Sequence, residues 1–93
     1  MNPLILKRTA QFKKDLRNMA KQGADLSLLD EPITLLLDRK PLPEKYHDHA
    51  LIGNWAGYRE CHIQPDWLFI YRIDNDALLL IATRTGSHSK LFA

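Results

Sequence analysis

The first half of the chain contains two segments in which apolar residues recur with the period of an α-helix. In the first segment, four apolar residues share one helical face: Phe12, Leu16, Met19 and Ala20. Thr9 stands where an N-cap is expected, because its hydroxyl can accept a backbone N–H of the first turn. Gly23 follows the last apolar residue and favours a helix end. The pattern predicts a helix from Thr9 to Gln22, preceded by a short strand near Pro3–Leu6.

The second periodic segment runs from about Leu26 to Asp38. Its apolar face consists of Leu29, Ile33, Leu36 and Leu37. Pro32 lies inside this segment, and proline both lacks a backbone donor and clashes with the carbonyl four residues earlier. Proline is tolerated in the first turn of a helix. We therefore expect the regular helix to begin near residue 30 or 31, and the prolines at 41 and 43 to prevent its continuation.

The second half of the chain changes to the period of a β-strand. Three strands are predicted there: Tyr58–Gln64, Trp67–Ile73 and Ala77–Arg84. Polar turn segments at Gln64–Asp66 and Asp74–Asp76 separate them, and residues 88–93 form a short tail. The element order β-α-α-β-β-β predicts an α+β fold with two helices packed on one face of a mainly antiparallel sheet.

Length and composition indicate one small soluble domain spanning residues 1–93. The chain has 93 residues, of which 45% are hydrophobic and 26% charged, which is typical of a globular protein. No apolar run approaches the ~20 residues of a membrane span, and we expect no signal peptide. Cys61 is the only cysteine, so neither an intrachain disulfide nor a CxxC metal site is possible. These features favour a reducing, cytoplasmic location.

Positive charge is concentrated at the N-terminal end, although the formal net charge is only +2. The first 21 residues contain six lysines and arginines against one aspartate. Such a segment suggests an anionic partner, either nucleic acid or an acidic protein. A solvated helix face explains the same charges equally well.

All four histidines lie in the second half of the chain: His47, His49, His62 and His88. In an antiparallel meander, the end of the first strand, the start of the second and the end of the third lie at one edge of the sheet. His62, Asp66, Trp67 and the turn from Arg84 to His88 should therefore converge. The hairpin geometry does not place His49.

Imidazoles beside a carboxylate, an arginine and aromatic rings are suited to RNA cleavage. That reaction needs a base for the ribose 2′-OH, a cationic clamp for the phosphate and an acid for the leaving 5′-oxygen, and Trp67 or Phe92 could stack on an unpaired base. A metal site built from His47, His49, His62 and Asp66 is the less favoured alternative, since the spacing matches no zinc pattern. Cys61 faces away from His62 and is expected in the core.

A series of motifs in residues 41–93 resembles a known protein family. The chain contains, in order, Pro41-Leu-Pro, Asp48-His49-x-Leu51-x-Gly53-x-Trp55-x-Gly57-Tyr58-Arg59, His62-Ile63-x-Pro65-Asp66-Trp67-Leu68-x-Ile70-Tyr71, Arg84-Thr85-Gly86-Ser87-His88 and Leu91-Phe92. This combination resembles the YafQ branch of the RelE/ParE toxin superfamily. The resemblance covers residues 41–93, and the N-terminal half matches only in its basic helical character.

The resemblance implies a type II toxin with a RelE-like, microbial-RNase-type fold. Such a toxin is a ribosome-dependent mRNA endoribonuclease that uses no metal or other cofactor and is neutralised by a cognate antitoxin, in a hetero-oligomer. The family's catalytic positions carry over as His49, His62, Asp66 and His88. Trp67 and Phe92 carry over as neighbours that support or contact RNA.

Our role assignments within this set are hypotheses. His88 is expected to be the general acid, and either Asp66 or His62 the general base. His49 and Arg84 are expected to hold the phosphate. Two alternatives stay open: Arg84 could instead form an ion pair at the strand end, and Trp67 could instead belong to the core.

The basic helix acquires a candidate role from the same resemblance. Lys13, Lys14 and Arg17 are expected to contact phosphates of 16S rRNA in the 70S ribosome. Two other functions remain open at this stage. One is a non-catalytic ParE-like module that binds a protein such as gyrase, and the other is a ribonuclease that acts on free RNA.

Overall fold

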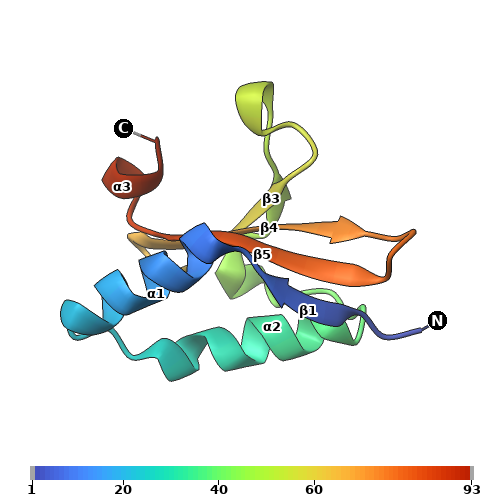
Figure 1. Cartoon of the computed structure of the whole chain (residues 1–93), viewed down its shortest axis with the longest axis horizontal. Helices are drawn as coiled ribbons and strands as arrows, with labels where there is room; N and C mark the ends of the chain where they lie inside the picture. Colours follow the sequence, from blue (N-terminus) through green and yellow to red (C-terminus); the bar gives the residue numbers. More distant parts are fainter. Residues whose placement is uncertain (1, 93) are drawn as a thin grey trace.

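The computed structural model describes residues 2–92, which build a five-stranded sheet in the order β1-β5-β4-β3-β2 (Figure 1). The strands are β1 (Ile5–Arg8), β2 (His49–Ala50), β3 (Arg59–Gln64), β4 (Trp67–Asp74) and β5 (Leu79–Gly86). β1 runs parallel to β5, and every other neighbouring pair is antiparallel. The predicted α+β fold and its mainly antiparallel sheet are confirmed.

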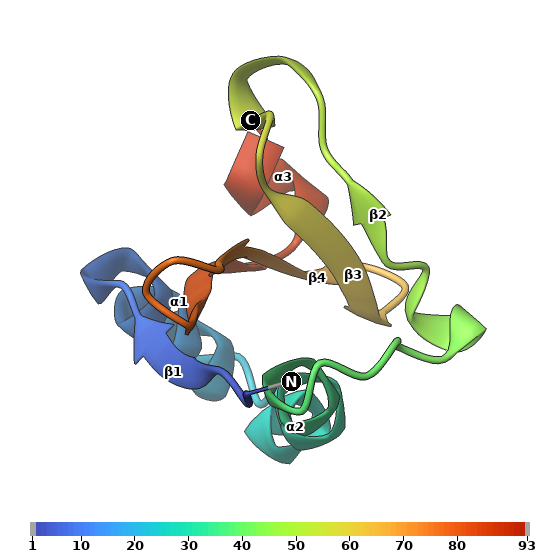
Figure 2. The same ribbon diagram turned by 90° about the vertical axis from the view of Figure 1, so that its right-hand side faces the viewer.

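Two helices cover one face of this sheet, as predicted (Figures 1 and 2). They are α1 (Ala10–Lys21) and α2 (Asp30–Leu37). Thr9 is the N-cap of α1, where its hydroxyl accepts the backbone N–H of Phe12 at 3.0 Å. A 3-10 helix, η1 (Leu26–Leu29), precedes α2 and leaves Pro32 in the first turn of α2. There the missing N–H of proline would have no partner within the helix.

The main core lies between the sheet and these two helices. Its buried residues are Leu4, Phe12, Leu29, Leu36, Tyr46, Cys61, Trp67, Phe69, Tyr71, Leu80 and Ala82. Alternation along β4 places Trp67, Phe69 and Tyr71 on this face, and the rings of Phe69 and Tyr71 stack at 5.3 Å. The predicted core position of Cys61 is confirmed, since it is fully buried.

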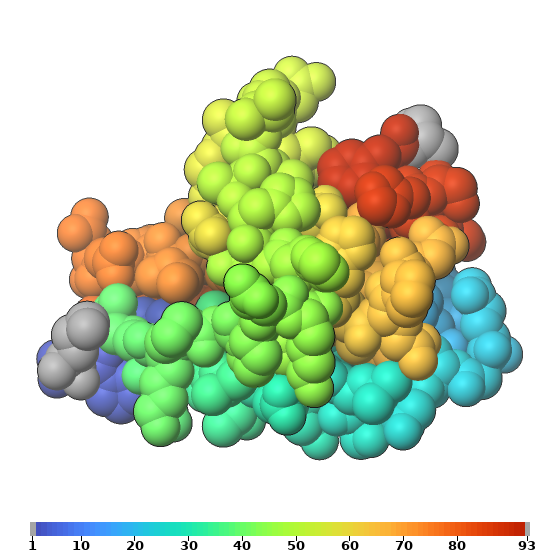
Figure 3. Space-filling view, turned by 180° about the vertical axis from the view of Figure 1, so that it is seen from behind, coloured from blue at the N-terminus to red at the C-terminus, as the bar shows by residue number. Residues whose placement is uncertain are grey.

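A smaller apolar cluster occupies the opposite face of the sheet. Leu68, Ile70 and Leu91 are buried there, with Leu51, Trp55 and Tyr58 packed against them. The cover consists of the loop around the 3-10 helix η3 (Gly53–Trp55) and the short helix α3 (His88–Phe92), which stand beside each other in Figure 3. The sequence predicts only a tail after residue 87. The helix forms because Leu91 packs against the sheet.

Some boundaries and exposures differ from prediction. β1 lies two residues later than expected, because Ile5–Arg8 pairs with Leu79–Ala82 of β5. β5 begins at Leu79 rather than Ala77, because the side chain of Asp74 accepts backbone N–H groups of the turn. Ala20 is exposed. Within residues 2–92, no helix is long and apolar enough to cross a membrane.

Candidate active site

The imidazole rings of His47, His49 and His88 gather around the ring of His62. Its ring centroid lies 5.7 Å from that of His47 and 6.3 Å from those of His49 and His88. The four rings come from three separate parts of the chain: His47 and His49 from the segment that leads into and begins β2, His62 from strand β3, and His88 from helix α3. His62 is about one-quarter exposed and His49 half exposed, so the cluster is open to a ligand.

Hairpin geometry brings His62, Asp66 and His88 to one edge, as predicted. His62 pairs with Leu68 across β3 and β4, and Leu68 pairs with Gly86 across β4 and β5. A bulge follows His62 in β3, where the register shifts before Gln64. Bulges re-aim side chains beside functional sites. The backbone N–H of His88 donates to Oδ1 of Asp66 at 3.3 Å.

His49 reaches the cluster through β2, a strand of two residues that the sequence does not reveal. It pairs there with Glu60 of β3. Its Nδ1 lies 2.8 Å from the carbonyl oxygen of His47, which can only accept, so Nδ1 carries the proton. This leaves Nε2 of His49 facing the carboxylate of Glu60.

The segment that carries His47 and His49 is anchored at the residue between them. Asp48 accepts hydrogen bonds from Tyr71 Oη and from Arg59, whose Nη2 lies 2.9 Å from Asp48 Oδ2. His47 itself has a left-handed backbone (φ 48°), an uncommon conformation for a residue other than glycine. The anchor therefore holds a strained turn against the sheet.

Glu60 is the site residue that the sequence analysis missed. Its Oε1 lies 3.6 Å from Nε2 of His49 and 3.5 Å from Nε2 of His62, and its side chain is only 5% exposed. A protonated imidazole at either position would pair with this carboxylate. The sequence did contain a signal for Glu60. It is two positions from His62 in a predicted strand, and such residues lie on the same face.

Phe92 lies at the edge of the cluster. Its ring centroid is 5.7 Å from that of His88 and 6.1 Å from that of Trp55, and it is 40% exposed. An exposed aromatic face beside an imidazole is available for stacking on a base.

Trp67, in contrast to Phe92, is not available for stacking on a base. It is 2% exposed, and its Nε1 donates to Thr85 Oγ1 at 2.8 Å inside the protein. The expectation that Trp67 contacts RNA is therefore wrong, and the core alternative is correct. Alternation with Phe69 and Tyr71 is what turns it inward.

Arg84 forms an ion pair at the end of its strand, which was the alternative to the expected phosphate contact. Its guanidinium donates two hydrogen bonds to the carboxylate of Asp15, from Nε to Oδ2 at 2.8 Å and from Nη2 to Oδ1 at 3.2 Å. Burial alone would raise the pKa of Asp15. Hydrogen bonds from Arg84, Gln11 and the Thr85 N–H outweigh it and hold this pKa below its usual value. Arg84 thus joins α1 to the end of β5 rather than the histidine cluster.

The expected ribosome-contacting cations lie outside the cluster. Lys13, Lys14 and Arg17 are exposed on α1, which covers the sheet face opposite α3 (Figure 1). Any contact they make with RNA would be separate from the histidine site.

Metal binding was the alternative reading of the histidines. Among residues 2–92, no group of three or more histidine, cysteine or acidic side chains is arranged to hold a metal ion. Cys61 is not a candidate nucleophile, because burial, assisted by the charges of Asp48 and Glu60, raises its pKa to about 12.

Comparison with known proteins extends this description. Residues 4–93 match the family described as "Bacterial toxin of type II toxin-antitoxin system, YafQ". The chain is 41% identical over 85 residues to the mRNA interferase toxin YafQ of Escherichia coli strain K12, covering 90% of each chain.

Solved structures agree with the fold. One is the toxin of the E. coli DinJ-YafQ toxin-antitoxin complex, with 38% identity, a TM-score of 0.88, and coverage of 98% of this chain and 99% of that one. Another is a metal-bound toxin from Helicobacter pylori, with 42% identity, a TM-score of 0.90, and coverage of 96% and 99%.

Proposed function

Because the chain belongs to the YafQ family of type II toxin–antitoxin toxins, we propose that it is an mRNA interferase that inhibits translation by cutting messages. The observation that carries this proposal is the packing of three imidazoles around His62 at 5.7–6.3 Å, next to Asp66. A purely binding ParE-like module has no need of such a cluster, so this alternative is not favoured.

The proposed reaction is attack by the ribose 2′-oxygen on the adjacent phosphorus. A base removes the 2′-OH proton, the P–O5′ bond breaks, and an acid protonates the departing 5′-oxygen. The products are a 2′,3′-cyclic phosphate and a 5′-hydroxyl, and no oxidant or co-reactant is needed.

We assign the base role to His62 in preference to Asp66. A neutral imidazole that takes up the proton becomes a cation, and Glu60 lies 3.5 Å away to stabilise it. Asp66 instead accepts the backbone N–H of His88 and so positions the start of α3.

His88 is the proposed general acid and His49 the phosphate ligand. His88 is exposed at the start of α3, and its ring centroid lies 6.3 Å from that of His62. His49 has one nitrogen fixed by the carbonyl of His47 and the other beside Glu60. When protonated, it supplies positive charge to the phosphate.

Catalysis without a metal is part of the proposal. The four imidazoles and Asp66 provide a base, an acid and a cationic group from the chain itself. Cutting by protein that has been stripped of metal with a chelator and then dialysed, assayed on ribosomes with Mg²⁺ as the only divalent ion, would agree with this. Cutting that requires an added transition-metal ion would contradict it.

We also propose that the substrate is presented by the ribosome in the cytoplasm. A net charge of +2 gives the protein little general hold on free RNA. Binding to the ribosome would position the message against the cluster. An antitoxin partner is proposed because the E. coli relative is known in complex with DinJ.

The test is to induce the protein in cells and map the 5′ ends of messages on ribosomes. Induction of the parent protein should produce new internal ends, and His88→Ala should lower their yield by about 10²–10⁴-fold. Growth arrest without new ends, or equal cutting by His88→Ala, would overturn the proposal. Inhibition of gyrase in place of cutting would support the ParE-like alternative.

A further inference from the structure

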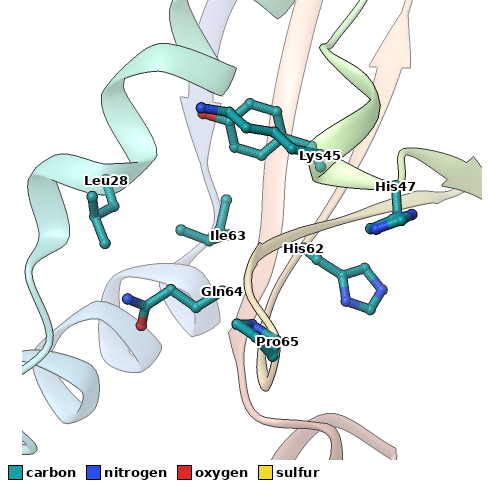
Figure 4. Close-up of a pocket in the computed structure, with 8 residues that line it drawn as sticks. Leu28, Lys45, His47, His62, Ile63, Gln64 and Pro65 are labelled. Atoms are coloured by element: carbon teal, nitrogen blue, oxygen red, sulfur yellow. The ribbon is translucent and has the colours of Figure 1, made fainter.

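A groove of about 790 Å³ opens directly beside the histidine cluster. It lies between η1 and the 3-10 helix η2 (Glu44–Tyr46) on one side and the end of β3 on the other (Figure 4). Residues that line it include Leu28, Lys45, His47, His62, Ile63 and Gln64. His47 and His62 therefore belong to both the cluster and the groove.

The groove exists because β2 is so short. β2 pairs only with Arg59 and Glu60, at the start of β3. The following part of β3, through Ile63 and Gln64, has no strand on its outer side among the described residues. An uncovered strand edge leaves backbone donors and acceptors free for a ligand.

The chemistry of the groove changes along its length. Leu28 contributes apolar surface on one side of the groove and Ile63 and Pro65 contribute it on the other, and Leu28 is 38% exposed. The amide of Gln64 projects from the end of β3 toward Leu28 (Figure 4). Apolar surface with one amide that both donates and accepts suits a flat heterocycle with polar edges.

A cationic side chain stands at the same groove. The Nζ of Lys45 lies 5.1 Å from the centroid of the Tyr46 ring, and its only ion pair among the described residues is with Glu31 at 3.7 Å. The side chain of Lys45 is 67% exposed, so that pair is weak. Lys45 is therefore available to a phosphate.

We propose that this groove holds the base of the message nucleotide next to the scissile phosphate, and that Gln64 determines which base is preferred there. This inference rests on the proposed ribonuclease function. The main support is that His62 belongs to both the histidine cluster and the groove. A message bound at the cluster would therefore have the base of an adjacent nucleotide within reach of the groove. Bidentate contacts between an amide and a base edge discriminate between bases.

The test is to map cleavage sites on ribosomes for Gln64→Ala and for Leu28→Trp, which fills the groove from the opposite wall. The parent protein should prefer one base at a position beside the cut. Gln64→Ala should reduce cutting at preferred sites by roughly ten- to a hundredfold and flatten that preference. Leu28→Trp should reduce cutting at all sites while the protein still binds its antitoxin.

Matched controls use the same residue types elsewhere. Gln22→Ala changes an exposed glutamine at the end of α1, and Ile52→Trp places a tryptophan at a position that is 88% exposed. Both should cut with the parent preference.

The outcomes distinguish failure of the proposed base subsite from failure of the proposed ribonuclease function. Unchanged preference in Gln64→Ala, unchanged cutting by Leu28→Trp, or no base preference in the parent would overturn the subsite and leave the ribonuclease function intact. Weakened antitoxin binding with unchanged preference would mean that the groove is a protein-docking site, and would also overturn it. Absence of cutting by the parent protein would overturn both proposals.

Discussion

The carboxylate of Glu60 lies 3.5 Å from Nε2 of His62, on the same face of the same strand. The two residues are separated by one position in β3, so strand alternation alone brings them together. The same carboxylate reaches His49 at 3.6 Å across the β2–β3 pair. The nearly buried carboxylate of Glu60 therefore lies within ion-pairing distance of both imidazole rings.

Replacement of this carboxylate should impair catalysis while preserving the fold. Glu60→Gln keeps the size and hydrogen-bonding capacity of the side chain but removes its charge. We expect kcat/KM for message cleavage to fall by about 10–100-fold, since loss of the nearby negative charge should destabilise the imidazolium of the transition state by ~1.4–2.8 kcal/mol. Glu44→Gln, at an exposed carboxylate in η2, is the control and should cut normally. Equal activity of the two variants would rule out a role for Glu60.

The ion pair between Asp15 and Arg84 should be visible in stability rather than in cutting. Asp15 is 5% exposed and also accepts the backbone N–H of Thr85 at 3.1 Å. Asp15→Asn should lower the free energy of unfolding at pH 7 by about 2–3 kcal/mol, measured by urea denaturation. Asp38→Asn, at an exposed carboxylate after α2, should leave stability unchanged within about 0.5 kcal/mol.

The effect of Asp15 also has a predicted pH dependence. Its pKa is lower in the folded protein than in the unfolded chain. Its contribution is therefore complete above the unfolded pKa of about 3.9 and is lost as the pH falls through the folded pKa. The stability difference between the parent and Asp15→Asn should shrink below about pH 4. A difference that stays constant into strong acid would contradict this account of the ion pair.

The single cysteine should be inert in the folded protein. Cys61 is fully buried, and its pKa is raised to about 12. The thiol is therefore protonated and shielded at neutral pH. Iodoacetamide should label it only after unfolding, as measured by mass spectrometry with and without urea. Native labelling at the rate of the unfolded chain would show that the strand β3 opens.

Charge reversal on α1 tests the expected contact with ribosomal RNA. Lys13→Glu, Lys14→Glu and Arg17→Glu together should weaken ribosome association and reduce its dependence on salt, since each lost phosphate contact lowers the salt slope by about one. Binding to the antitoxin should change less. Lys40→Glu, at an exposed position after α2, serves as the control. Equal losses for ribosome and antitoxin, or no loss, would remove α1 from the ribosome contact.

Local signals in the sequence were sufficient for most of the fold. Helical periodicity and the Thr9 cap predicted α1, and the position of Pro32 predicted where α2 begins. Hairpin geometry then predicted that His62, Asp66 and His88 meet. These inferences succeed because each depends on contacts between neighbours in sequence or on a short turn.

The remaining features depend on partners distant in sequence. β2 has two residues and no alternating pattern, so local signals did not place His49 beside His62, and only the family resemblance assigned both to one site. Arg84 forms its ion pair with Asp15, which is 69 positions away in the sequence. The burial of Glu60 likewise depends on the segment folded over it, although its face was readable from the strand.

The most direct test of 2′-OH chemistry at the histidine cluster uses a message with a single 2′-deoxynucleotide immediately 5′ of the scissile phosphate. Ribosomes programmed with this message and with its all-ribose counterpart are treated with the parent protein under identical conditions. The account predicts that the all-ribose message is cut to a 2′,3′-cyclic phosphate and a 5′-hydroxyl, and that the substituted message stays intact at that site. Cutting of the deoxy-substituted message at the same bond would contradict it.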